Sequence, residues 1–453
     1  MNTKDYHTTV ICSEELDDLK AIADVAISDI TFEEYPNLLI FPDSFECYDR
    51  DFGKKEICSI KEKDTKLCTN SIVGFVGRNE THLSIRSRFA AEGDEDYFLH
   101  YMLQKVAGIN LFNLQHTTNE DSGFDFLIYL FPLFLKRAVS QGIYKKYITR
   151  KYNDANVRGT IDVNRHIRFN EPFNGKVAYT TREYSYDNEV TQLIRHTIEF
   201  INKEKGGDIL MNAPDVQQAV YQIIDATPSY LSSELQSVIN RNLRPVLHPY
   251  YSQYTLLQRL CLQILRHEEL KYGKEKDEIY GVLIDAAWLW EEYLNTVLSE
   301  IGFTHPKNKE GKGGIRMFIN PTEEGSFDSN GRRIYPDFYR EDYILDAKYK
   351  HLEEGVGRED LYQVVSYMYC MDKPYGGYVY PDDSGQKATS FKLAGKGLKY
   401  ERDTGGILSV IPFKIPQKAD NWKDFLQGIN QSESRLKESF APDNIRAQVP
   451  SCF

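Results

Sequence analysis

The sequence lacks any long apolar segment. Its longest apolar run, Phe126 to Leu135, is about half of the roughly 20 residues that a membrane-spanning helix needs. The N-terminal stretch MNTKDYHTTVICSEELDD carries acids where a secretory signal would carry an apolar stretch. We therefore expect a cytoplasmic protein with no membrane contact.

Cysteine is also scarce. The 453 residues include seven cysteines, at 12, 47, 58, 68, 261, 370 and 452, and no CxxC. An odd count of scattered cysteines favours reduced thiols over a disulfide framework. Cys47, Cys58 and Cys68 have no set of histidines nearby, and the ten histidines form no HxxxH pair. These absences argue against a zinc site.

Two further absences narrow the function. The chain contains no GxxxxGK[ST] phosphate loop, so we expect it to bind no nucleotide. Its net charge is −12, whereas a dedicated nucleic-acid coat would be basic. Between residues 136 and 168, however, nine Lys or Arg face only two Asp. Such a stretch can bind phosphate, form a solvated helix face or dock on an acidic partner.

Composition and length predict an ordinary globular protein of several domains. Apolar residues make up 41% of the chain and charged residues 27%. Residues 1–115 are predicted to form a β-rich domain, with two strands in 71–89 around the turn Arg78-Asn79-Glu80. Residues 116–270 are predicted to be mainly helical, at about 124–147 (with a kink or delay at Pro132), 188–203, 215–225 and 253–269. The charged stretch 269–278 is the candidate linker.

Residues 271–453 are predicted to form a compact α/β domain. A helix at 286–302 ends at Gly302, a typical C-terminal signal. Strand-like runs follow at 316–320, 335–340 and 343–350, then a helix at 358–371 and a strand at 376–381. The fold class is therefore α+β multidomain, ending in a helix, three-strand, helix, strand unit. The polar tail after about 430 is expected to be loosely ordered.

Two acids and a lysine in this last region form the main candidate site. Asp346 and Lys348 share one strand face, since residues i and i+2 project together. If a two-residue turn at Glu341-Asp342 joins the strands, Asp337 lies directly opposite Asp346. Carboxylates that close repel by on the order of 3 kcal/mol at a dielectric of about 20.

A divalent cation such as Mg²⁺ would relieve that repulsion, because it favours a few carboxylates together with water and substrate phosphate. Lys348 could then orient an attacking water or stabilise charge on the phosphate. The alternative interpretation is a surface ion-pair cluster on an exposed sheet face.

The flanking helices add two features. Glu291 borders the apolar side of its helix, whereas Glu292 points to a wetter face, and an inward carboxylate needs a partner. Gln363 and Tyr367 lie at i and i+4 on one face of the later helix. The alternative for this second pair is an ordinary helix surface.

A helix Glu followed by PD, DxK and QxxxY resembles the layout of the PD-(D/E)xK nuclease superfamily. Within it, the chain resembles the McrC family, the nuclease subunit of McrBC-type restriction systems. VGFVGRNETHLSIRSRF is similar to the N-terminal β-segment of that family. VRGTIDVNRHIRFN and REYSYDNEVTQLIRHTI resemble its two central segments, and YPDFYREDYILDAKYK and DLYQVVSYMY its nuclease motifs. The order of these motifs over about 300 residues is specific.

The resemblance implies roles for individual residues. Asp337 and Asp346 would bind the catalytic Mg²⁺, for which Mn²⁺ could substitute, and Lys348 would assist hydrolysis. Glu291 would be the helix carboxylate, with Glu292 as its alternative. Gln363 and Tyr367 would be accessory, either orienting the site or contacting DNA.

The resemblance also implies a partner. McrC-like proteins work with McrB, an AAA+ GTPase ring, into which their N-terminal region inserts to stimulate hydrolysis. Arg158, in the basic stretch, would be a trans-acting arginine. Thr160 stands where relatives often carry a second basic residue, so the 158–160 loop departs from the family pattern at this position.

The function expected from these features is that of a Mg²⁺-dependent endonuclease subunit of a McrBC-like restriction complex in phage defence. It would cut double-stranded DNA when assembled with the ring, and two complexes meeting would give a double-strand break. One alternative is a non-catalytic adaptor that activates an AAA+ NTPase. A second is a stand-alone PD-(D/E)xK repair nuclease.

Overall fold

The computed structural model describes most of the chain in two compact units. The described residues are 1–12, 15–23, 25, 27, 35, 37–41, 56–61, 65–79, 81–91, 96–107, 122–205, 208–211, 213–271, 279–306, 314–318, 333–352, 355–394 and 406–441. One unit combines Met1–Gly108 with Glu275–Phe453, and the other is Ile109–Lys274. The protein is thus of mixed α/β type with several sheets.

The strands are β1 (Asn2–Lys4), β2 (Thr8–Val10), β3 (Asn37–Phe41), β4 (Cys58–Lys61), β5 (Lys66–Thr69), β6 (Ile72–Arg78), β7 (Thr81–Arg86), β8 (Lys146–Asp154), β9 (Thr160–Ile161), β10 (Val177–Ser185), β11 (Ile279–Asp285), β12 (Ile315–Arg316), β13 (Arg333–Ile334), β14 (Phe338–Tyr339), β15 (Tyr343–Ala347), β16 (Tyr375–Asp382), β17 (Thr389–Lys392) and β18 (Ile407–Lys414). The helices are α1 (Leu16–Ile22), α4 (Tyr97–Ala107), α5 (Ser122–Ser140), α6 (Val163–Asn170), α7 (Glu189–Lys205), α8 (Asp208–Met211), α9 (Pro214–Ala226), η3 (Ser232–Glu234), α10 (Leu235–Arg241), α11 (Ser252–Lys271), α12 (Ala286–Leu298), η4 (Ser299–Ile301), α13 (Arg358–Cys370) and α14 (Trp422–Ser439). Within the described part of the chain, no helix combines the length and apolar character needed to cross a bilayer.

The first unit contains a five-stranded sheet in the order β1-β7-β6-β11-β3. The hairpin predicted in 71–89 is confirmed as β6 and β7, which pair antiparallel. Asn79 has φ 52°, a left-handed conformation that Asn tolerates in tight turns. Leu83 and Ile85 are buried, as their alternation with Ser84 and Arg86 predicts. The hydrophobic period therefore gives the face of this hairpin correctly.

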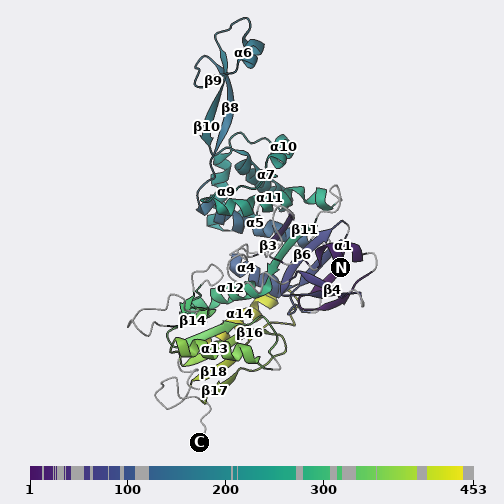
Figure 1. The fold of residues 1–453 in the computed structure, drawn as a ribbon, viewed down its shortest axis with the longest axis vertical. Helices are drawn as coiled ribbons and strands as arrows, with labels where there is room; N and C mark the ends of the chain where they lie inside the picture. Colours follow the sequence, from purple (N-terminus) through teal and green to yellow (C-terminus); the bar gives the residue numbers. More distant parts are fainter. Residues whose placement is uncertain are drawn as a thin grey trace. The chain divides into compact units, whose positions relative to one another are not determined.

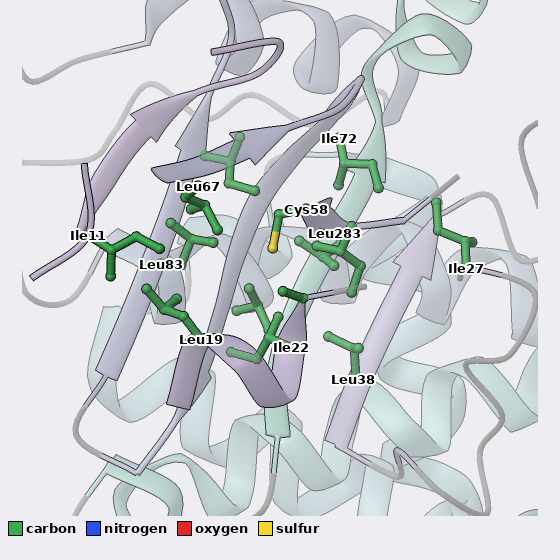
Figure 2. Close-up of a cluster of buried hydrophobic side chains, with 14 residues drawn as sticks. Ile11, Leu19, Ile22, Ile27, Leu38, Cys58, Leu67, Ile72, Leu83 and Leu283 are labelled. Atoms are coloured by element: carbon green, nitrogen blue, oxygen red, sulfur yellow. The ribbon is translucent and has the colours of Figure 1, made fainter. Parts of the chain in front are cut away.

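A hydrophobic cluster holds α1 and the smaller sheet β2-β5-β4 to this five-stranded sheet. Leu19 and Ile22 of α1 pack with Leu67, Leu83 and Leu283, all fully buried (Figure 2). Leu283 belongs to β11, about 200 residues beyond its sheet neighbours. Its burial fixes this late strand into the N-terminal core, because removing apolar surface from water stabilises the pairing.

Gly281 is required where β11 lies against β6. It has φ +151°, and an added Cβ would lie 2.3 Å from the carbonyl oxygen of Phe75. We predict that Gly281→Ala destabilises the first unit by about 2–4 kcal/mol, through backbone strain and a clash that only strand separation relieves. Gly302→Ala is the control, because Gly302 also has positive φ but open space around it. Denaturant unfolding of both variants measures the difference, and equal losses would contradict the close approach.

The same unit contains a second five-stranded sheet, β14-β15-β16-β18-β17, in which β15, β16 and β18 run parallel. Helix α12 precedes it, and Gly302 ends the following 3-10 turn with φ +85°, as predicted. Helix α13 connects β15 to β16, also as predicted. The prediction of a three-strand core is wrong in detail. Within the described residues, β12 pairs with β13 alone, and Pro336, which lacks a backbone N–H, separates β13 from β14.

The unit boundaries differ from the sequence-based division at 115 and 270. The middle unit, Ile109–Lys274, is close to the expected helical region, but the segments on either side of it form one unit. The reason is β11, which pairs with β6 and β3. Most of the candidate linker, residues 272–278, lies outside the described residues, and α11 extends to Lys271.

The second unit is a helical bundle that carries a β-arm. Helices α5, α7, α9 and α11 pack together, with the expected Pro132 inside α5. The residues after α5 do more than connect two helices. Residues 146–154 form β8, which pairs with β10 along nine residues in the three-stranded sheet β8-β10-β9, and α6 lies at the far end of this sheet (Figure 1). The prediction of a mainly helical region therefore misses the arm, defined here as residues 146–185.

Candidate active site

The turn at Glu341-Asp342 brings the two predicted acids together. Phe338 pairs with Leu345 and Tyr339 with Ile344, and the backbone N–H of Arg340 donates to the carbonyl of Tyr343. This is the register that the two-residue turn requires, and its continuation sets Asp337 opposite Asp346. The backbone N–H of Ala347 donates to Oδ2 of Asp337 at 2.8 Å, which fixes the first carboxylate against the second strand.

Asp346 is 2% exposed, so the surface-cluster interpretation is wrong for this residue. Burial raises the pKa of Asp337 well above its ordinary value, and the nearby carboxylates of Asp346 and Glu291 raise it further. Burial also raises the pKa of Asp346, against the opposing charge of Lys348. The pair resists carrying two negative charges, as expected for close carboxylates at low dielectric.

Lys348 supplies the positive charge beside this pair. Its Nζ lies 2.7 Å from Oδ2 of Asp346 and 3.2 Å from Oδ1 of Asp360. Burial opposes the charged form, but the carboxylates of Asp346, Asp337 and Asp360 outweigh it and raise the pKa of Lys348. Lys348 is therefore held as an ammonium group, a donor of hydrogen bonds and a source of positive charge.

Helix α13 lines the site with one face. Gln363 accepts a hydrogen bond from Lys348 at 3.5 Å and donates one to the hydroxyl of Tyr367 at 2.8 Å. Asp360, which sequence reasoning missed, lies one turn earlier on the same face and also pairs with Lys350. Its spacing from Gln363 and Tyr367, i, i+3 and i+7, is the signal that could have identified it. The structure thus brings the predicted accessory pair to the acid–acid–lysine set.

Helix α12 distinguishes its two glutamates. The charge of Glu291 contributes to the raised pKa of Asp337, which places Glu291 in the field of the site. Glu292 instead pairs with Nε2 of His305 at 3.7 Å. His305 was not anticipated from the sequence, since no motif surrounds it. Its Nδ1 lies 2.7 Å from the carbonyl oxygen of Asp337 and its ring stacks on Phe338 at 4.8 Å, so it supports the strand that carries Asp337.

The residues present fit a divalent cation that completes its shell from elsewhere. Among the described residues, no group of three or more His, Cys, Asp or Glu could hold a metal by itself. Two carboxylates are nevertheless sufficient for Mg²⁺, which keeps water or phosphate in its remaining positions. Oδ2 of Asp346 lies 2.7 Å from Nζ of Lys348. An ionised carboxylate has about four lone-pair sites, so Asp346 can contact Lys348 and still offer lone pairs to a cation.

The N-terminal part of the same unit supports the strand end behind Lys348. The hydroxyls of Ser87 and Tyr349 lie 2.7 Å apart in a buried hydrogen bond. The ring of Phe89 packs against Tyr349 at 5.2 Å and against His351 at 4.6 Å. The segment after Lys348 is thereby held by the loop that follows β7.

Arg158 lies in the second unit, at the loop between β8 and β9. Its side chain is exposed. A Cβ on the neighbouring Gly159 would lie 2.1 Å from the carbonyl oxygen of Thr180, so glycine is needed for the loop to approach β10. Apolar side chains are exposed around this end of the arm, notably Val163 and Phe173, at 60% and 69%. Exposed apolar groups beside cations are typical of a protein-binding surface.

Residues 67–381 match the family model described as McrBC 5-methylcytosine restriction system component. No curated protein matches the chain. Among solved structures, a half-complex from a tetradecameric assembly of Thermococcus gammatolerans McrB AAA+ hexamers with bound McrC is 15% identical, with 95% of this chain and 99% of that chain covered and a TM-score of 0.45. The cryo-EM structure of the Thermococcus gammatolerans McrBC complex is 14% identical, with 66% and 87% covered and a TM-score of 0.34.

Proposed function

The chain belongs to the McrC family of McrBC restriction-system components, and on that basis we propose that it is a metal-dependent DNA endonuclease subunit. The β14–β18 sheet with α12 and α13 would be a PD-(D/E)xK nuclease core. The observation that carries this proposal is the pairing of half-buried Asp337 opposite buried Asp346, with Nζ of Lys348 2.7 Å from Oδ2 of Asp346. Two repelling carboxylates, one of them buried, cost stability, and an adaptor without catalysis would gain nothing from them.

The residues of the acid–acid–lysine set and the two accessory residues of α13 would each have a role in hydrolysis of a phosphodiester. Asp337 and Asp346 would hold Mg²⁺, for which Mn²⁺ could substitute. A bound cation would supply positive charge for the phosphate as negative charge develops. Lys348 donates hydrogen bonds from a fixed position to the phosphate oxygens or to the attacking water. Gln363 orients Lys348, and Tyr367, which is 7% exposed, orients Gln363.

The two glutamates of α12 test this assignment. We predict that Glu291→Gln lowers the cleavage rate by about 10- to 100-fold, the usual effect of removing a group that supports metal ligands. Glu292→Gln is the matched control and should retain at least about a third of the activity, because Glu292 faces His305. Steady-state cleavage of plasmid DNA with Mg²⁺ measures both. A larger loss in Glu292→Gln would assign the helix carboxylate to Glu292.

We further propose that the chain works with a McrB-like AAA+ GTPase ring, which binds McrC in the assembly named above. The arm, with its exposed apolar and basic side chains, would engage the ring and stimulate its hydrolysis. Arg158 would act in trans at the nucleotide. Double-stranded DNA would be the substrate, and two assembled complexes would meet to cut both strands.

A further inference from the structure

A cationic cleft lies at the same sheet edge as Asp346 and Lys348. The carboxyl ends of β16 and β18 open into a cavity of about 480 Å³ between the loop 383–385 and α14. Lys414, Lys418 and Arg435 line it, all exposed. Within the described part of the chain, none of the three forms an ion pair. Their charges are therefore available to a ligand.

Hydrogen bonds to a buried carboxylate hold one wall of this cleft in place. The buried carboxylate of Asp382 accepts hydrogen bonds from the backbone N–H groups of Ser384, Gly385 and Gln386. The acid in the lining, Asp383, faces His351 at 3.6 Å. A second hollow of about 500 Å³ along α14 shares Gln431 and Arg435 with the cleft and has Glu438 as its acid. Amides, hydroxyls, Lys and Arg are the side chains that contact nucleic-acid phosphates.

We propose that this cleft binds the phosphodiester backbone of the DNA strand beside the cleavage site. The proposal rests on the nuclease function proposed above and adds a contact outside the acid–acid–lysine set. Parallel register aligns Ala347 with Val379 and Val379 with Ile411, so Lys414 lies two strands across and two residues beyond Lys348. Strand spacings of about 4.8 Å and 3.3 Å per residue put their Cα atoms roughly 12 Å apart.

That separation suits one DNA strand. The axial rise is about 3.4 Å per nucleotide and phosphates are also displaced around the helix, so roughly 12 Å spans no more than about three nucleotides from the scissile phosphate. The lining is polar, with Ile415 and Pro416 as its apolar members, so it lacks the aromatic anchors typical of a protein–protein hot spot. A phosphate backbone therefore fits the cleft better than an acidic protein does.

The test is fluorescence anisotropy of the full-length chain with a labelled 30-base-pair duplex, in EDTA and at 50–200 mM NaCl. The triple variant Lys414→Ala/Lys418→Ala/Arg435→Ala should bind at least about 10-fold more weakly at 100 mM. Its plot of log K against log[NaCl] should be shallower by about 2–3, because each phosphate contact contributes about 0.9. Arg435→Ala alone should lower the slope by about 1.

Lys392→Ala is the charge-matched control, since the exposed Lys392 pairs with Ile407 at the opposite end of β18. It should change Kd by less than about twofold. Equal binding by wild type and triple variant, or no binding by wild type at 50 mM, would overturn the inference. If the triple variant binds DNA normally but no longer stimulates the partner GTPase, the cleft is a binding site for the partner, and the inference is also overturned.

The two proposals can fail separately. If the assembled wild type cuts DNA and the triple variant binds and cuts normally, the cleft inference alone is wrong. If no form cuts DNA but the triple variant still loses duplex binding, the cleft is a DNA surface and the nuclease proposal is wrong.

Discussion

Asp346→Asn is expected to abolish DNA cleavage, by at least about 1,000-fold, while the chain remains folded. The substitution keeps the shape of a side chain that is 2% exposed, but removes the charge on the oxygen beside Lys348. Metal-dependent hydrolysis depends on that charge, whereas packing in the sheet does not. Stimulation of the partner GTPase should be unchanged, because the arm belongs to the other unit. Loss of stimulation in this variant would contradict a two-module protein.

Asp337→Asn is expected to change the thermal stability of the fold and its dependence on pH. The folded-state pKa of Asp337 is raised above the ordinary value of 3.8 by burial and by Asp346. From pH 3.8 up to that raised pKa, the folded state binds more protons than the unfolded chain, so rising pH destabilises the fold. In EDTA, Asp337→Asn should lack this loss and melt at a higher temperature than wild type, with the gap widening as pH rises.

The control for this measurement is Asp424→Asn, at the exposed first turn of α14. It should not reproduce the gain. Equal pH dependence of melting in Asp337→Asn and wild type would show that ionisation of Asp337 beside Asp346 does not lower the stability of the fold.

Arg158→Ala is expected to reduce stimulation of the partner GTPase by at least about 100-fold, if the arginine acts in trans as an arginine finger does. Gly159→Ala should have a comparable effect, because a Cβ would collide with Thr180 and move the loop. Arg241→Ala is the charge-matched control, since Arg241 is exposed on α10 of the same unit, outside the arm. GTP hydrolysis by the ring, titrated with each variant, measures the effect.

Both arm variants should leave the nuclease unit folded, with unaltered thermal melting of that unit. Full stimulation by Arg158→Ala and Gly159→Ala would remove the β8–β9 loop from the partner interface. Equal loss in Arg241→Ala would show that overall charge, and not the loop, controls stimulation.

The central residues of the candidate site can be predicted from local patterns in the sequence. A two-residue turn fixes the register of β14 and β15, and register alone sets Asp337 opposite Asp346. The i, i+4 spacing of Gln363 and Tyr367 is equally local, and their hydrogen bond at 2.8 Å agrees with it. Gly302 ends its helical segment because glycine adopts the left-handed conformation at little cost, and this depends on one residue alone.

Long-range pairing is what the sequence does not reveal. The sequence of β11 is that of an ordinary apolar strand. Its pairing with β6 and β3 depends on burial against residues about 200 positions away. The arm was missed because both faces of β8 are largely polar or exposed, so its residues lack the alternation that identifies strands. The tail after 430 was expected to be loosely ordered, but α14 extends to Ser439 because Phe425, Ile429 and Leu436 bury one face.

Control of the nuclease by the ring is tested most directly by cleavage of plasmid DNA with Mg²⁺, using wild type and Asp346→Ala, each alone and with the AAA+ partner and GTP. We expect cutting by wild type in the presence of partner and nucleotide, and none by Asp346→Ala under any condition. Equal behaviour of the two proteins would contradict this expectation and favour the non-catalytic adaptor. Cutting by wild-type chain alone, without nucleotide, would contradict control by the ring and favour a stand-alone nuclease.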